Sequence, residues 1–582
     1  MNDVAKETIA TSEEGVEHAN RDGKRSSDSA TVAMRRDRAY DRLAFWLVLV
    51  VLGIAFVLHL GMVAPGRFGG YYDDTIYVTA AKSLATGQGY KMISLPQPVA
   101  QTLVPPFYPF VLSLVWRLDP RFPQNLRWMM LVSVIAMMGF LLLIWRYLVM
   151  NGYASRWQAL AVIALAAINW RQMSLATSII SEVVFALLSV ATLLIAERYE
   201  KEQSGWRTGA GLGLMAGLAF LTRTSGLVLL AAVVVYYLYR RRWTKVLVPV
   251  AVASLFIIGW FGWGYLNRNT IGGEHAAYYA GYVHGITETV GKLQAVNHVS
   301  RLMVHLKIIE TNALGLILVW GPLQTLGLRA SLSMSLLIPV IISSLALIVA
   351  GFARELRKGP RLLEIYLVFY IALHLVVPGH SYERYVMPIV PFLLFFLIRE
   401  LSALLLMLRT ALTSSGQVFA KAAAATIGLV VAVGAAIALY SNSTGIYHAL
   451  ASPRPAAGSE ADAEAIDWIV ANTDPSSVLV GFGDLKYYLY TGRKAVRSIP
   501  VTMLDINVYQ ATEPDSNELL TVFRNITHEN RGAYMVLNEA DFRDQAPAYG
   551  KSIEAYVKQH PEEFVPMFES KEGRTAIYRI DY

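Results

Sequence analysis

The stretch "LAFWLVLVVLGIAFVLHLGMV", residues 43–63, carries no Lys, Arg, Asp or Glu along its whole length. A hydrocarbon core about 30 Å thick requires roughly 20 apolar helical residues, so this stretch predicts a membrane-spanning helix. Residues 1–42 are polar, lack the pattern of a cleavable signal and predict a disordered cytoplasmic tail. We therefore expect a polytopic α-helical membrane protein with about 11 transmembrane helices. The other apolar segments lie at 127–149, 157–170, 176–196, 208–222, 224–239, 246–265, 331–352, 361–378, 385–407 and 419–440.

The composition of the whole chain agrees with this expectation. Of its 582 residues, 55% are hydrophobic and only 16% are charged, which excludes a soluble protein of this size. The absence of cysteine excludes a disulfide framework, a thiolate metal site and a cysteine nucleophile. The net charge of +8 divides into −7 on residues 451–582 and +15 on the remainder. Because the basic residues cluster in short loops, they indicate topology and not nucleic-acid binding.

The basic loops define the orientation of the predicted spans. Placing them in the cytoplasm puts the N-terminus inside and leaves three parts on the outer face: a loop at 64–126, a loop at 266–330 and a domain at 450–582. We expect residues 105–118 to form an amphipathic helix along the outer surface, because they are few for a crossing and open with two prolines. Residues 302–323 are also expected in or near the outer interface. The basic loops are at 34–38, 146–156, 197–207, 239–245 and 353–361.

The chain thus divides into a tail (1–42), a membrane module (43–449) and a soluble outer domain (450–582). Within the outer domain, residues 464–496 read "EAIDWIVANTDPSSVLVGFGDLKYYLYTGRKAV". An amphipathic helical pattern is followed by a proline turn and then by a short β-rich run with glycines. This order predicts a small α/β domain.

An acidic pair lies just beyond the first predicted span. In "GGYYDDTIYVTAAKSLATGQGY", residues 69–90, Asp73 and Asp74 precede a helical pattern that ends at "TGQG". An Asp at that position is a good N-cap, so capping alone is one explanation of the pair. Neighbouring helical side chains diverge by about 100 degrees, so both cannot cap the same amides. We expect one Asp to cap the helix and the other to face a cavity.

Other polar residues fall near the outer ends of the predicted spans. Glu182 is early in a span, where a carboxylate is a functional candidate by default, although an ion pair or a helix-packing hydrogen bond explains it nearly as well. Each arginine alone is more often an interface anchor than a ligand. Gathered on one face, the basic residues would suit a phosphate at the membrane surface. The basic candidates are Lys82, Arg223, Arg268, His380 and Arg384.

Seven of these features occur in an order that resembles a known family. They are the Asp pair, "YVTAAKSLATGQGY" (77–90), "PPFYPFVLSL" (105–114), "SE" (181–182), "GLMAGLAFLTRTSGL" (213–227), "RN" (268–269) and "RYVMPIVPFLLF" (384–395). The order looks like the GT-C fold and resembles the dolichyl-phosphate-mannose–protein mannosyltransferase family, which includes the bacterial aminoarabinose transferases. The resemblance covers about residues 43–440.

The resemblance implies an inverting membrane glycosyltransferase. Such an enzyme takes a sugar from a polyprenyl-phosphate donor at the outer face of the bacterial cytoplasmic membrane, with the C-terminal domain outside. In the family the first acidic residue of the pair is the catalytic base, so Asp73 inherits that role, with Asp74, Tyr77, Glu182 and Tyr385 in support. The usual second residue is Glu, and Asp74 is shorter. "PPFYPF" also lacks the basic residue that commonly precedes the prolines.

The sequence leaves alternatives for the acceptor, for a bound metal ion and for the class of protein. The acceptor hydroxyl belongs to a lipid, a glycan or a protein, and the sequence favours none of them. Two adjacent carboxylates suit Mg²⁺ or Mn²⁺, so a divalent cation at Asp73 and Asp74 is a further hypothesis, although no other dense ligand cluster accompanies them. The alternative to a transferase is a flippase for lipid-linked sugars or a secondary transporter. That class should place its ionisable groups near mid-membrane, and not at the outer ends of spans.

Overall fold

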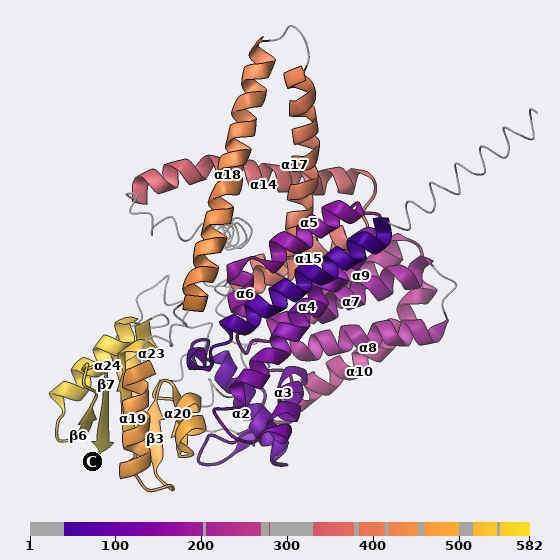
Figure 1. The fold of residues 1–582 in the computed structure, drawn as a ribbon. Helices are drawn as coiled ribbons and strands as arrows, with labels where there is room; N and C mark the ends of the chain where they lie inside the picture. Colours follow the sequence, from indigo (N-terminus) through magenta and orange to yellow (C-terminus); the bar gives the residue numbers. More distant parts are fainter. Residues whose placement is uncertain are drawn as a thin grey trace, which may run out of the picture.

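The protein is built from a helical body, two projecting helices and a small sheet domain at the opposite end (Figure 1). The computed structural model describes residues 40–201, 205–268, 279, 330–376, 383–413, 418–451, 459–499, 516–543 and 547–581. Four predictions therefore fall largely or wholly outside the described residues. They are the disordered tail, most of the loop at 266–330, the interfacial segment at 302–323, and His380.

Each apolar segment expected to span the membrane is helical over most of its length, although residues 177–181 of the segment at 176–196 are not. The first is the helix Tyr40–Met62. The helices Arg156–Ala167 (α5) and Trp170–Ala176 (α6) meet at 67° around Asn169, whose side chain caps α6. The other helices are α4 (Leu126–Met150), α5 (Arg156–Ala167), α6 (Trp170–Ala176), α7 (Glu182–Lys201), α8 (Trp206–Thr222), α9 (Gly226–Tyr239), α10 (Thr244–Leu266), α14 (Ala330–Arg357), α15 (Leu362–Val376), α17 (Val390–Thr413) and α18 (Val418–Ala451).

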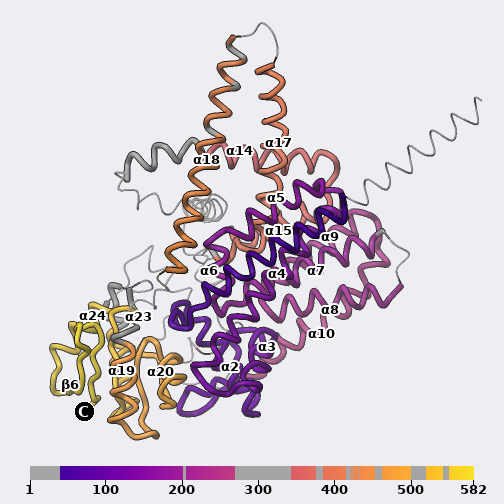
Figure 2. Tube along the Cα trace, viewed as in Figure 1, coloured from indigo at the N-terminus to yellow at the C-terminus, as the bar shows by residue number. Residues whose placement is uncertain are grey.

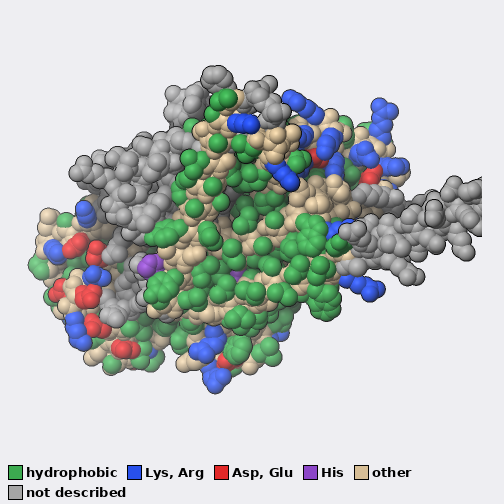
Figure 3. All heavy atoms as spheres, turned by 45° about the horizontal axis from the view of Figure 1, so that its top comes forward, with side chains coloured by type: hydrophobic (Ala, Val, Ile, Leu, Met, Phe, Trp, Pro, Cys, Tyr) green, Lys and Arg blue, Asp and Glu red, His purple; other side chains and the backbone are tan. Residues whose placement is uncertain are grey.

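The helical body is that of a multi-span membrane protein. Among the described residues, five helices are long and apolar enough to cross a bilayer alone, or six if α5 and α6 form one bent span. Hydrophobic side chains cover the centre of the face in Figure 3, while charged side chains gather at its edges and on the C-terminal domain. The multi-span character is therefore confirmed, and the figure of eleven spans stays a prediction. The five helices are Tyr40–Met62, Leu126–Met150, Thr244–Leu266, Arg384–Thr413 and Lys421–Ala451.

Two short helices form the region after the first span. Helix α2 (Asp73–Ala85) packs against α3 (Phe107–Leu118), and a two-stranded antiparallel ribbon of β1 (Lys91–Met92) and β2 (Val99–Ala100) lies between them in sequence. Helix α3 confirms the predicted helix at 105–118. Its inner side buries Tyr108, Leu112 and Trp116, whereas its outer side exposes Phe110, Leu114 and Leu118. An apolar outer side agrees with a position against the membrane surface.

The C-terminal domain is a mixed α/β unit, as predicted. Its five-stranded sheet has the order β4-β3-β5-β7-β6, with β3 parallel to both β4 and β5, and β7 antiparallel to β5 and β6. The strands are β3 (Val478–Gly481), β4 (Lys494–Val496), β5 (Tyr534–Asn538), β6 (Phe564–Glu569) and β7 (Thr575–Ile580). The helices are α19 (Ser459–Asn472), α20 (Asp484–Thr491), α22 (Ser516–Glu529), α23 (Glu539–Arg543) and α24 (Pro547–Gln559).

The C-terminal domain docks on the region that holds the acidic pair. Helix α20 lies beside α2, as both the ribbon and the Cα trace show (Figures 1 and 2). The backbone amide of Ala495 donates to the carbonyl of Ser94 at 2.8 Å, and Lys494 Nζ donates to the carbonyl of Ile93 at 2.6 Å. The edge strand β4 is thereby tied to the loop that follows α2. The loop at 64–126 and the C-terminal domain thus lie on one side of the membrane body.

Candidate active site

The first element of the site is an ion pair between residues far apart in the chain. Asp73 is the first residue of α2, and its Oδ2 lies 2.8 Å from Nη1 of Arg384 in α16 (Glu383–Val386). The Arg384 side chain is 5% exposed, whereas that of Asp73 is 20% exposed. Asp73 is therefore the member of the pair that a substrate can reach.

Glu182 joins this pair to a second arginine. Its Oε1 lies 3.3 Å from Arg384 Nε and 2.8 Å from Nη1 of Arg223, which follows α8. The Glu182 side chain is 1% exposed, so it depends on these cations to offset its burial. The four side chains form a chain of alternating charge, Asp73–Arg384–Glu182–Arg223, with a formal net charge of zero. We call these four residues the charged cluster.

Hydroxyl groups complete the charged cluster. Ser181 Oγ accepts from Arg223 Nη1 at 3.1 Å and lies 2.9 Å from the hydroxyl of Tyr77. Burial raises the pKa of Tyr77, so this hydroxyl stays protonated and retains a hydrogen to donate. Tyr385 Oη accepts from Arg384 Nη2 at 3.0 Å, and the Tyr385 ring lies 4.9 Å from the Arg223 guanidinium. Both arginines are thus fixed in direction by more than one contact.

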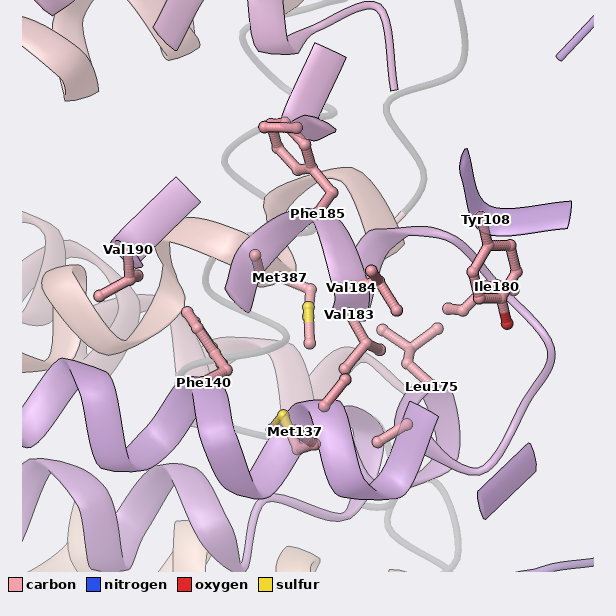
Figure 4. Packing of buried hydrophobic residues seen from close by; sticks show 14 of the residues in the cluster. Tyr108, Met137, Phe140, Leu175, Ile180, Val183, Val184, Phe185, Val190 and Met387 are labelled. Atoms are coloured by element: carbon pink, nitrogen blue, oxygen red, sulfur yellow. The ribbon is translucent and has the colours of Figure 1, made fainter. Parts of the chain in front are cut away.

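Apolar packing brings the segments of the charged cluster together. Residues on either side of Glu182, including Ile180 and Val183, are fully buried, as is Met387 of the short helix η3 (Met387–Ile389). Figure 4 shows Met387 beside Val183 and above Met137 of α4. Because η3 directly follows α16, this contact sets Arg384 against the start of α7.

Asp74 has a role different from that of its neighbour. It is buried, its Oδ2 accepts from the Gly69 amide at 2.8 Å, and its Oδ1 accepts from the Thr75 amide at 2.8 Å. Burial raises the pKa of Asp74 to about 7, and the two amides oppose that rise. The sequence expectation of an aspartate N-cap was wrong, since the N-cap of α2 is Tyr72 and its side chain does not cap the helix. Asp74 instead ties the preceding loop to the first turn.

We expect Asp74→Asn to destabilise the protein measurably. Asparagine has one acceptor oxygen, so its amide group would face a backbone N–H and one of the two hydrogen bonds would be lost, at about 1 kcal/mol. Asp474→Asn is the matched control, because a single oxygen, Oδ1, accepts both bonds from Ser476 and is retained in Asn. Thermal unfolding in detergent should show a lower midpoint for D74N than for D474N. Equal midpoints would contradict the role assigned to Asp74.

The structure brings together six of the predicted site residues: Asp73, Tyr77, Glu182, Arg223, Arg384 and Tyr385. Lys82 lies elsewhere, with its Nζ 4.5 Å from the ring centre of Tyr488 in the C-terminal domain. Arg268 is exposed, and its guanidinium stacks on Tyr265 of its own turn. Glu182 was expected within a span, but it is the first residue of α7, because the helix begins six residues later than predicted.

Two further members of the site were not predicted as site residues, although Ser181 is the serine of the "SE" feature at 181–182. Ser181 bonds both Arg223 and Tyr77, and the Tyr71 ring lies 5.9 Å from the Arg384 guanidinium. Ser181 directly precedes Glu182, and Tyr71 lies two residues before Asp73. Their neighbours were therefore the available signal, but a lone serine or tyrosine in an apolar segment is not distinctive.

A divalent cation at the acidic pair does not fit the present arrangement. Both oxygens of Asp74 accept backbone amides, and Asp73 faces Arg384. Within the described ranges, no group of three or more His, Asp or Glu side chains is arranged to hold a metal. A cation there would have to displace an arginine and two amides, so the metal hypothesis stays a prediction with no step built on it.

Comparisons with known proteins bear on the fold of the chain and on one of its segments. Residues 103–269 match the family model of the dolichyl-phosphate-mannose-protein mannosyltransferases. No curated protein sequence matches the chain significantly. The structure of ArnT from Cupriavidus metallidurans bound to undecaprenyl phosphate is similar with a TM-score of 0.50 at 14% identity, covering 92% of this chain and 97% of that one.

An archaeal enzyme shows the same fold. The oligosaccharyltransferase AglB from Archaeoglobus fulgidus, in complex with an inhibitory peptide and a dolichol-phosphate, is similar with a TM-score of 0.52 at 13% identity. The match covers 92% of this chain and 74% of AglB. This chain therefore shares the fold of these two enzymes, and its residues 103–269 are similar to the dolichyl-phosphate-mannose-protein mannosyltransferase family.

Proposed function

We propose that the protein transfers a sugar from a polyprenyl-phosphate-linked donor to an acceptor hydroxyl at the outer face of the bacterial cytoplasmic membrane. The observation that carries this proposal is the charged cluster, in which a reachable carboxylate lies 2.8 Å from a buried arginine. Glu182 contacts this arginine and also Arg223, whose Nη1 lies 2.8 Å from Glu182 Oε1. The cluster thus places a proton acceptor beside two cations, which is what displacement of a phosphate requires.

The reaction is an inverting single displacement. The oxygen of the acceptor hydroxyl attacks the anomeric carbon, the carbon–oxygen bond to the donor phosphate breaks, and Asp73 takes the hydroxyl proton. Such a transfer passes through an oxocarbenium-like state, as glycoside hydrolysis does. The acceptor is a hydroxyl of a lipid, a glycan or a protein.

The arginines stabilise the leaving group. As the bond breaks, the polyprenyl phosphate gains negative charge, and guanidinium groups aimed at it lower the barrier. Glu182 occupies one edge of each guanidinium, Nη1 of Arg223 and Nε of Arg384, and so orients both. Arginine carries five donors in a planar group, which suits the recognition of a phosphate. Lys82 and Arg268 contact other residues and are not part of this proposal.

The membrane position of the site supports a lipid-linked donor. The two similar structures named above contain undecaprenyl phosphate and dolichol-phosphate, respectively. The charged cluster joins α2 and α16 at the start of α7 and the end of α8, and these are helix ends that the loop charges orient outward. The transporter alternative requires charges near mid-membrane and gains no support from this placement.

A transfer assay tests the proposal directly. The purified full chain is incubated in detergent with a polyprenyl-phosphate sugar and candidate acceptors, and products are identified by mass spectrometry. In parallel, a deletion strain should accumulate the lipid-linked donor, whose sugar the same method identifies. We expect formation of a glycosylated product together with free polyprenyl phosphate. Movement of intact donor between leaflets of proteoliposomes, without product, would instead establish the transporter.

A further inference from the structure

The backbone just before the catalytic aspartate has an unusual conformation. Tyr72 has φ 57° and ψ −46°, a region that residues with a side chain seldom adopt. Its carbonyl accepts the amides of Thr75 at 3.0 Å and Ile76 at 3.3 Å, so this carbonyl begins α2. Such a conformation persists only when its surroundings impose it. The contacts of the Tyr72 side chain therefore matter for the position of Asp73.

Those contacts are made by the C-terminal domain. The hydroxyl of Tyr72 donates to Oδ1 of Asp484 at 2.7 Å, and Asp484 is fully buried at the start of α20. The Arg497 guanidinium lies 4.2 Å from the centre of the Tyr72 ring and 4.0 Å from Asp484 Oδ1. The tyrosine is thus held by a carboxylate at its hydroxyl and a cation on its ring.

The same carboxylate also binds Tyr279. Tyr279 donates its hydroxyl to Asp484 Oδ2 at 2.6 Å, and this hydroxyl accepts from the backbone amide of Arg497 at 3.2 Å. Each oxygen of Asp484 therefore accepts from one tyrosine, and each tyrosine comes from a different outer loop. Burying a carboxylate is unfavourable unless it is well hydrogen-bonded, so the arrangement is specific to this docked geometry.

We propose that Asp484 is a positioning residue that acts through Tyr72 to hold the start of α2, and hence Asp73, in its reactive position. The C-terminal domain thereby contributes to catalysis without contacting the substrate. The inference about catalysis rests on the proposed function, whereas the inference about backbone position does not. We call the contact between Tyr72 and Asp484 the interdomain latch.

The test uses three variants of the full chain. Tyr72→Phe removes the hydroxyl and keeps the ring, and Asp484→Ala removes the carboxylate. Tyr490→Phe is the matched control, because Tyr490 packs its ring against Phe68 and Phe122 at the same interface, and the ring is retained.

Hydrogen–deuterium exchange provides a measurement independent of activity. The amide of Ile76 reports on the Tyr72 carbonyl, because it donates to it, whereas the Thr75 amide also donates to Asp74 Oδ1 and is not used as a reporter. We expect the Ile76 amide to exchange at least about tenfold faster in Y72F and D484A than in the wild type, with Y490F unchanged. If D484A does not fold, the amide exchange of Y72F alone tests the proposal. An exchange rate at the Ile76 amide of Y72F equal to that of the wild type would overturn the latch, and the contact would then only attach the domain.

Kinetics test the catalytic part of the proposal. Misplacement of a catalytic group by about 1 Å costs roughly 10²-fold, so kcat should fall by about 10- to 100-fold in Y72F while affinity for polyprenyl phosphate is kept. The double variant Y72F/D484A should be no slower than the slower single variant, because both remove one contact. Additive losses would overturn the action through Tyr72. If exchange is faster in Y72F and D484A than in the wild type, but the wild type transfers no sugar, the proposed function is refuted. The positioning role of Asp484 is then still supported.

Discussion

Replacement of Asp73 by Asn should lower turnover by roughly 10²–10⁴-fold while leaving the protein folded. Asparagine keeps the shape of the side chain and a hydrogen bond, but its amide cannot take the proton of the acceptor hydroxyl. The side chain is one-fifth exposed and lies at the first position of α2, so the substitution leaves no cavity in the core. Single-turnover transfer with a labelled donor measures the effect.

Affinity for the donor separates the loss of a base from the loss of the ion pair. D73N also removes one of the two carboxylates that contact Arg384, so the site repels an incoming phosphate less. We therefore expect D73N to bind polyprenyl phosphate at least as tightly as the wild type, in contrast to its slow turnover. D474N, an Asp→Asn change on the exposed surface of the C-terminal domain, is the control and should be fully active. Near-normal turnover in purified D73N would remove Asp73 from the base role.

The sequence predicted which residues belong to the site better than it predicted which of them contact one another. Apolar segments about 20 residues long predict helices because the bilayer fixes their length, and loop charges predict which ends face outward. Asp73, Glu182, Arg223 and Arg384 were therefore placed at outer helix ends. Their pairing depends on how η3 packs against α7, and that contact leaves no local pattern in the chain.

Lys82 shows an error that the sequence alone could have prevented. It lies nine residues after Asp73, which is about two and a half helical turns, so the two side chains leave α2 on opposite sides. The structure places Asp73 against Arg384 and Lys82 against Tyr488 of the C-terminal domain.

The features that the sequence did not predict depend on contacts between residues far apart in the chain. Tyr72 and Asp484 are separated by 412 positions, so no local pattern predicts their contact or the positive φ of Tyr72. The N-cap prediction for the Asp pair failed for a related reason. The docked domain fixes where α2 begins, so Asp74 serves the Gly69 and Thr75 amides instead.

Arg384→Ala should weaken binding of polyprenyl phosphate by about 30-fold to several thousand-fold, which corresponds to about 2–5 kcal/mol for truncating a buried, hydrogen-bonded charge. The guanidinium is the central member of the charged cluster, with Asp73 on Nη1, Glu182 on Nε and Tyr385 on Nη2. Its removal leaves two carboxylates facing one another with no cation between them. The negative charge of these carboxylates would then repel the phosphate of an incoming donor. This repulsion adds to the loss of the arginine that binds the phosphate.

Two comparisons make the Arg384 prediction specific. Arg384→Lys keeps the charge but loses the planar group that serves several acceptors at once, so its affinity should fall between those of the wild type and R384A. Arg121→Ala is the matched control, because Arg121 is 77% exposed, pairs with Asp119 and lies in the same outer loop as Asp73. Affinities are measured by titrating the purified, folded variants with polyprenyl phosphate. If R384A binds as tightly as R121A does, Arg384 serves only to neutralise Asp73 and Glu182, and the phosphate must be held by Arg223 without it.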